Sequence, residues 1–125
     1  VLTEEQSFTQ LRKSVTKLAE LMVKDTQMAM IYLIECTKIA NTRPLQQLYL
    51  NSLNAYFQDV LHAKIQLEVI KAYPDLEAEI TEISKHLSLN DISKYIQVIT
   101  EANRKLAQNV NATLVLEQMV INGKR

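Results

Sequence analysis

Apolar residues recur at spacings of three and four along most of the chain, which is the period of an amphipathic α-helix. Helix periods of this kind cover the sequence, so the pattern predicts about six helices and no strand. Three stripes are the clearest: Phe8, Leu11, Val15, Leu18 and Met22; Leu76, Ile80, Ile83 and Leu87; and Ile92, Ile96, Ile99, Asn103, Leu106 and Val110.

Two of the expected helices do not have a single apolar stripe. The second helix begins after Asp25 and leaves little polar surface, so we expect it to be deeply buried. Its apolar residues are Met28, Met30, Ile31, Leu33 and Ile34. The third helix, expected from about Pro44 to Ala72, has two stripes and should therefore contact neighbours on two sides. These stripes are Leu45, Tyr49, Tyr56, Val60, Ala63 and Leu67, and Leu50, Leu53, Phe57, Leu61 and Ile65.

The helix boundaries are marked by residues that cap unpaired backbone groups. Thr3 with Gln6, and Ser88 with Asp91, are spaced as capping boxes. A break is expected at Asn41-Thr42-Arg43-Pro44, with Thr42 or Arg43 near the cap, and another at Tyr73-Pro74-Asp75. Asn103, within an otherwise apolar stripe, is either a buried amide that needs partners or a sign that the stripe turns toward solvent there.

The end of the chain predicts a short, strongly apolar helix. Asn111 is the expected N-cap, and Val110 with Val115 forms a hydrophobic staple. The helix that follows is apolar on most sides, through Leu114, Val115, Leu116, Met119, Val120 and Ile121. Such a helix must insert into something, and since it has no residues suited to catalysis, it resembles an assembly element.

Composition supports a single all-α domain, a compact bundle of residues 1–125. The chain has one glycine and two prolines, too few for the turns of a sheet. It has 14 basic and 14 acidic residues with no block of like charge, so we expect no direct binding of nucleic acid. One cysteine, no signal peptide and no membrane span predict a cytoplasmic protein. The absence of an initiator methionine predicts a domain excised from a longer chain.

Residue types suited to catalysis are present but do not form a motif. His62 and His86 have no partner at metal-ligand spacing, so no metal site is expected. Cys36 lies late in its helix and is best interpreted as a core cysteine. No glycine-rich loop could hold a phosphate group, so we expect no cofactor and no enzymatic activity in this domain.

The segment from Leu87 onward resembles the end of the delta prime subunit family of bacterial DNA polymerase III clamp loaders. The similarity lies in Leu87-Ser88-Leu89-Asn90-Asp91-Ile92, in Ala102-Asn103-Arg104-Lys105-Leu106, and in the run from Asn109 to Glu117, with the pattern N-x-N-x-x-L-x-L-E. Residues from Ala19 to Ala63 also fit the collar domain of this family. Family members often have proline where this chain has Ala112.

The resemblance implies a collar domain at the C-terminal end of a loader subunit, which joins delta and gamma/tau collar domains in a ring and takes part in sliding-clamp loading during DNA replication. The parent complex would be a DNA-directed DNA polymerase holoenzyme, although this domain would be non-catalytic. Candidate contact residues are Tyr95, Gln97, Asn103 and Arg104. Two alternatives remain: the paralogous gamma/tau collar, whose chain normally continues past this point, and a free-standing helical adaptor that binds protein.

Overall fold

The computed structural model describes residues 3–124. Within this range the chain forms six α-helices, one short 3-10 helix and no strand, so the all-α prediction is confirmed. The elements are α1 (Glu4–Lys24), α2 (Thr26–Ile39), α3 (Arg43–Ile65), η1 (Pro74–Leu76), α4 (Glu77–Lys85), α5 (Leu89–Ala107) and α6 (Ala112–Gly123).

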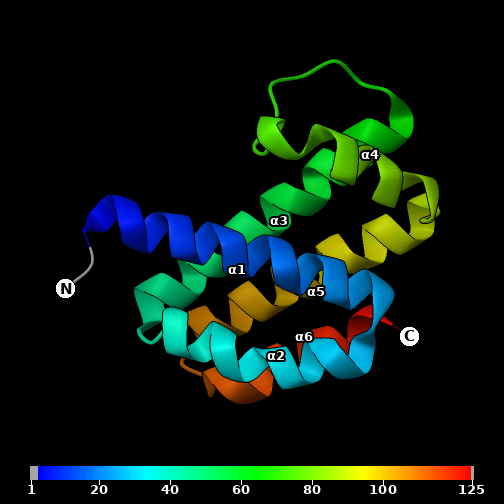
Figure 1. The fold of residues 1–125 in the computed structure, drawn as a ribbon. Coiled ribbons are helices and arrows are strands. Elements are labelled where there is room, and N and C mark those ends of the chain that lie inside the picture. The colour runs from blue at the N-terminus through cyan, green and yellow to red at the C-terminus, as the bar shows by residue number, and fades with distance from the viewer. Residues whose placement is uncertain (1–2, 125) are drawn as a thin grey trace.

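Helix α3 occupies the centre of the bundle (Figure 1). It packs against α1, α4 and α5, which agrees with the two apolar stripes in its sequence. Helix α2 contacts α1 and α6, and α6 contacts α5 and α2. Helices α2 and α6 therefore lie side by side at one edge of the bundle, at the bottom of Figure 1.

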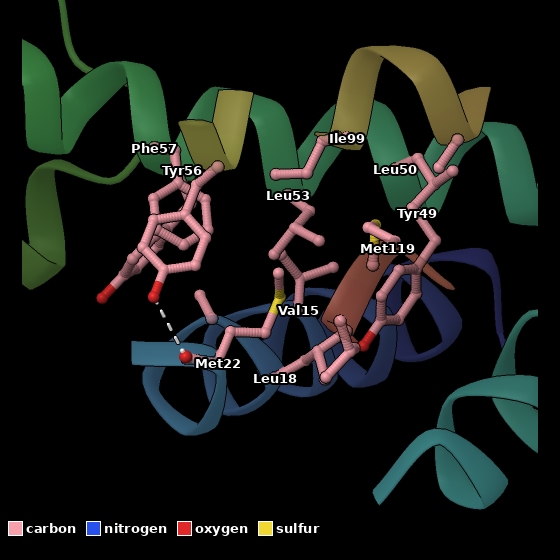
Figure 2. Close-up of a cluster of buried hydrophobic side chains, with 14 of the residues drawn as sticks. Val15, Leu18, Met22, Tyr49, Leu50, Leu53, Tyr56, Phe57, Ile99 and Met119 are labelled. Carbon is pink, nitrogen blue, oxygen red and sulfur yellow. Dashed lines mark hydrogen bonds between the residues drawn. The ribbon is translucent and has the colours of Figure 1, made fainter. Parts of the chain in front are cut away.

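The core lies where α1, α3, α5 and α6 meet (Figure 2). Phe57 of α3 and Tyr95 of α5 stack with ring centroids 4.9 Å apart, and Tyr56 packs edge-on against Phe57. Burial of such rings supplies much of the hydrophobic stabilisation of a small domain. The largest fully buried side chains are Tyr49, Tyr56, Phe57, Leu18, Met22, Leu50, Leu53, Ile80, Ile92, Ile99, Leu106 and Val15.

The predicted caps are confirmed. Thr3 and Ser88 form complete capping boxes with Gln6 and Asp91. Asp25 caps α2, Thr42 caps α3 and Asn111 caps α6, in each case by accepting a hydrogen bond from a backbone N–H three residues on. These side chains satisfy donors that a helix start leaves unpaired, so short polar residues at these positions set where each helix begins.

The predicted end of the third helix was wrong. Helix α3 ends at Ile65, because Gln66 takes a left-handed conformation with φ 57° and its N–H turns back to the carbonyls of His62 and Ala63. Residues 67–73 then form an irregular segment that arcs away from the helices at the top of Figure 1. The apolar period continues to Leu67, which is why the sequence pattern extended the helix too far.

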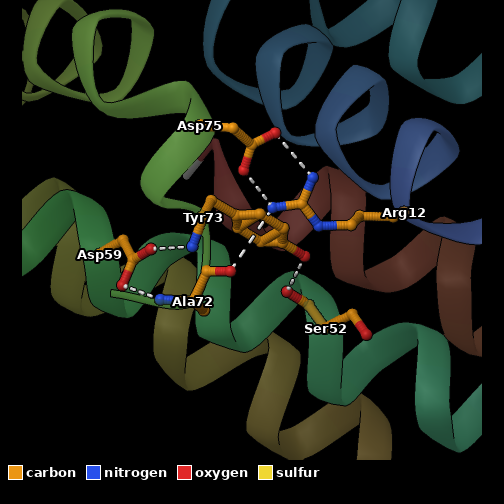
Figure 3. A network of polar contacts seen from close by, with 6 residues as sticks. All are labelled: Arg12, Ser52, Asp59, Ala72, Tyr73 and Asp75. Atoms are coloured by element: carbon orange, nitrogen blue, oxygen red, sulfur yellow. Dashed lines mark hydrogen bonds and ion pairs between the residues drawn. The ribbon is translucent and has the colours of Figure 1, made fainter. Parts of the chain in front are cut away.

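Polar contacts fix the return of this segment to the bundle (Figure 3). Buried Asp59 accepts hydrogen bonds from the backbone N–H groups of Ala72 and Tyr73, at 3.2 and 2.7 Å. Arg12 of α1 donates to both carboxylate oxygens of Asp75 at 2.9 and 2.6 Å, and its guanidinium lies 4.4 Å from the centre of the Tyr73 ring. A planar guanidinium suits both contacts at once.

The prediction that the second helix is deeply buried was also wrong. Helix α2 buries only Ala29, Leu33 and Cys36, while Ile31 and Ile34 are 62% and 61% exposed. The reason is its position at the edge of the bundle, where it packs mainly against α1 and α6. Phe8, predicted to belong to the first stripe, is exposed as well, in the N-terminal part of α1 that extends beyond its neighbours (Figure 1).

Helix α6 is docked firmly at its C-terminal end. The only glycine, Gly123, is buried, and a Cβ atom at this position would lie 3.2 Å from two carbons of the Tyr95 ring. Its φ is not positive, so close packing rather than backbone conformation explains the glycine. The neighbouring Lys124 donates to the main-chain oxygen of Val23 in the last turn of α1, at 3.2 Å. The predicted insertion of the last helix is therefore confirmed on this side.

Candidate interaction site

Residues suited to catalysis remain dispersed in the fold. His86, the residue that follows α4, is exposed and lies 3.3 Å from Glu82 of that helix. His62 lies on α3 and is half-buried, and its buried Nδ1 has no hydrogen-bond partner among residues 3–124. Among residues 3–124, no three His, Cys, Asp or Glu side chains come together in a group that could hold a metal ion.

Cys36 takes part in a buried polar cluster between α1, α2 and α3. Its sulfur lies 3.1 Å from the Tyr49 hydroxyl, which in turn lies 2.8 Å from the Ser14 hydroxyl. Burial raises the pKa of the Cys36 thiol and of the Tyr49 phenol. A thiol with a raised pKa is a poor nucleophile at neutral pH. The contacts of this cluster link the three helices.

The four candidate contact residues of α5 do not form one surface. Tyr95 is only 4% exposed, stacks on Phe57 and donates to a backbone oxygen, so its selection as a surface residue was wrong. Gln97 and Arg104 are exposed, and Arg104 forms an ion pair with Glu101 of the same helix. Asn103 is half-buried and donates to Asn51 of α3 at 2.7 Å. Asn103 therefore lies at the margin of the stripe, which continues to buried Leu106, so the structure matches neither of the two expected outcomes fully.

A larger surface, of which the sequence reasoning anticipated only the part on α6, lies along α2 and α6. Ile31 and Ile34 of α2, and Leu114 and Ile121 of α6, are all between 42% and 62% exposed. On each helix the two residues are three or seven positions apart and so share one side. We call these four residues the α2–α6 face. The signal in the sequence was the lack of polar positions on both helices. For the second helix this was interpreted as deep burial, and for the last helix as the mark of an assembly element.

A groove separates the two helices that carry this face. Its volume is about 380 Å³, and it is lined by Met30, Leu33, Ile34, Thr37, Thr113, Leu116 and Glu117. Ile34 belongs to both the face and the groove lining, so the two features are continuous. The charged neighbours on α2 neutralise each other, because Lys38 pairs with Glu35 at 3.3 Å. The groove and the face together offer an apolar surface, with the Glu117 carboxylate in the groove lining.

This arrangement can bind another apolar surface. Monomeric proteins rarely expose large contiguous apolar patches, and those that are exposed commonly mark sites of association. Within residues 3–124 no helix has both the length and the apolar character needed to cross a membrane. Comparison of the chain with the models of known protein families gave no match, and comparisons with curated proteins and with solved structures gave none either.

Proposed function

We propose that this domain is a non-catalytic oligomerisation domain, the collar part of a subunit in a bacterial clamp loader. Its partners are the collar domains of delta and gamma/tau subunits. The observation that carries this proposal is the exposed α2–α6 face, which lies on helices that are themselves held firmly in the bundle. The resemblance of the chain from Leu87 onward to the delta prime family names the assembly.

Rigidity distinguishes this face from a loosely packed chain end. Helix α6 is capped by Asn111 at its start and is anchored through Val115, Leu116 and Met119, all of which are buried. Arg43 of α3 donates to the main-chain oxygen of Val110 at 2.9 Å, which fixes the turn that leads into α6. A preformed surface loses little conformational entropy on association, and binding is stronger for that reason.

The chemistry of the face suits a protein partner. Protein interfaces have an apolar centre with few charges and a polar rim. Ile31 and Ile34 supply the centre on α2, while Gln27 and the Glu35–Lys38 pair lie on the same helix at its margin. The chain has a formal net charge of zero, so long-range repulsion does not oppose the approach of another subunit.

Two alternative functions share this face. The paralogous gamma/tau collar would use it in the same ring, at a different position. A free-standing helical adaptor would use it to bind a protein outside any loader. The alternatives differ in partner and not in chemistry, so a binding experiment separates them.

The test is to mix the domain with purified delta and gamma/tau collar domains and to measure the mass of the products by light scattering. The proposal predicts complexes with one or both partners at tens of micromolar and moderate salt. Monomers alone under these conditions would overturn the collar assignment and leave the adaptor as the better explanation. Binding to delta but not to gamma/tau would also distinguish neighbours within the ring.

A further inference from the structure

The irregular segment after α3 has the geometry of an extended strand. Residues 67–71 contain no turn or sharp bend, and none of them has a positive φ. Leu67, Val69 and the side chain of Lys71 are 48%, 39% and 22% exposed, whereas Ile70 between them is 100% exposed and Glu68 is exposed as well. This alternation has the period of a strand, with one row of side chains toward the bundle and the other away from it.

Most main-chain groups of this segment have no hydrogen-bond partner among residues 3–124. The N–H groups of residues 68–71 and the carbonyl groups of residues 67–71 make no such bond there. Proteins usually shield a free strand edge with proline, a bulge or repeated like charges. Residues 67–71 include no proline, and their two charges, on Glu68 and Lys71, are of opposite sign. The segment is therefore open to pairing with another strand.

Both ends of the segment are held in place by the bundle. At its start, the N–H of Leu67 donates to the carbonyl of His62 at 2.9 Å. Just after its end, Asp59 accepts hydrogen bonds from the N–H groups of Ala72 and Tyr73. A strand that is fixed at both ends loses less conformational entropy on pairing than a free chain does.

The sequence of the segment complements itself in one antiparallel register. When Glu68 lies opposite Lys71 of a second copy, two-fold symmetry repeats the pair, so two pairs of opposite charge form. Val69 then lies opposite Ile70 of the second copy, and this apolar pair also occurs twice. Pairs of both kinds stabilise antiparallel strands. Lys71 already pairs with Glu77 at 3.3 Å, but an ammonium group has three donors and can bond to a second carboxylate.

The same register accounts for the full exposure of Ile70. In this register each side chain that points away from its own bundle lies opposite one that points toward the bundle of the second copy. The two bundles therefore lie on opposite faces of the paired strands. Ile70 points toward the second bundle and loses contact with water on pairing, so its burial contributes to association.

We propose that residues 67–71 pair with the same residues of a second copy as antiparallel strands, which makes the chain a symmetric homodimer. An unrelated edge strand would offer the main-chain groups but not the matching charges. Two strands of this length bury less surface than a standard interface, so the dimer is weak. The proposal does not rest on the collar function, because the segment and the α2–α6 face lie at opposite sides of the bundle (Figure 1).

The test is sedimentation of the 125-residue chain at concentrations up to about 1 mM, a range that suits a small interface. We expect a monomer–dimer equilibrium. Glu68→Lys alone and Lys71→Glu alone should each weaken dimerisation by about tenfold or more, because each places like charges opposite one another. An equimolar mixture of the two variants should restore the dimer, since each supplies the charge that the other lacks. A wild-type chain that stays monomeric, or a mixture that associates no better than either variant alone, would overturn the proposal.

A control distinguishes this contact from self-association through the α2–α6 face. Ile31→Glu changes that face and should leave dimerisation unchanged. Ile70→Pro removes a main-chain N–H that has no partner among residues 3–124 and should weaken dimerisation at least tenfold. Circular dichroism checks that both variants fold, and the mixture of charge variants tests the proposal even if Ile70→Pro does not. Loss of the dimer in Ile31→Glu but not in Ile70→Pro would overturn the proposal and place the contact on the α2–α6 face.

Discussion

The hydroxyl of Tyr95 donates a hydrogen bond of 3.1 Å to the main-chain oxygen of Met22, although 73 residues separate the two in sequence. Met22 lies in the last turn of α1, where carbonyl groups have no partner within the helix. This bond, shown as the dashed line to Met22 in Figure 2, therefore ties the end of α1 to the N-terminal half of α5. Gly123 packs against the same tyrosine ring, so one side chain joins three helices.

Replacing Tyr95 by phenylalanine should lower the free energy of unfolding by about 1–2 kcal/mol, because the Met22 carbonyl loses its partner in a buried environment. The ring and its stacking on Phe57 are retained, so the fold should not change. Urea unfolding followed by circular dichroism measures the effect. Tyr32→Phe is the control, since the Tyr32 hydroxyl is part-buried and makes a longer bond of 3.3 Å. An equal loss of unfolding free energy in both variants would show that the bond to Met22 stabilises the fold no more than the bond of Tyr32 does.

Gly123→Ala should destabilise the domain, although alanine is the better helix former by up to about 1 kcal/mol. The new Cβ would lie 3.2 Å from the Tyr95 ring, and this ring cannot move easily because Phe57 and Met22 hold it on other sides. Thermal unfolding measures the change. A melting temperature above that of the wild type would mean that the end of α6 is free to shift.

Two leucines of α6 should behave differently when each is replaced by alanine. Leu116 is buried, so Leu116→Ala should cost about 2–5 kcal/mol of stability. Leu114 is half exposed, so Leu114→Ala should cost well below 1 kcal/mol. Unfolding in urea measures both. If neither substitution changes the transition, α6 is not docked, and the rigid α2–α6 face does not exist in solution.

The ion pair between Arg12 and Asp75 should make stability depend on pH in acid. The guanidinium holds the pKa of the Asp75 carboxyl below its ordinary value of about 3.9. Because the folded pKa is the lower one, the stabilisation is fully present above the ordinary pKa and is lost as pH falls through the lowered value. Asp75→Asn should thus be less stable than the wild type at pH 6, and the difference should shrink below about pH 4. A difference that is constant across this range would contradict the assignment.

The sequence predicted where helices begin more accurately than it predicted which distant residues contact them. Caps such as Ser88 and Asn111 act within one turn, so local sequence was sufficient to place the starts of α5 and α6. The end of α3 at Gln66 could not be predicted in this way, because the segment beyond it folds back onto Asp59 of α3 and is held by Arg12 of α1, which is distant in sequence. An apolar period shows which residues tend to be buried. It does not show whether they are buried inside the fold or in a contact with a partner.

The same limit applies to the candidate site. Ile31 and Ile34 are large apolar residues of the kind that form protein cores. Only the position of α2 at the edge of the bundle shows that they lie outside the core. Tyr95 was selected as a contact residue from its place on α5, but its neighbours Phe57 and Met22 are distant in sequence and bury it. Contacts between distant segments decide which apolar residues remain available for a partner.

The most direct test of the central claim, that the α2–α6 face is an assembly surface, compares two substitutions of exposed isoleucines. Ile31 lies in the face and is 62% exposed, whereas Ile70 lies in the irregular segment after α3 and is fully exposed. Calorimetric titration with the delta and gamma/tau collar domains measures the dissociation constants. Ile31→Glu should weaken binding at least tenfold, about 1.4 kcal/mol, while Ile70→Glu should leave it unchanged. Equal affinities of the two variants for both partners would show that this face does not form the contact.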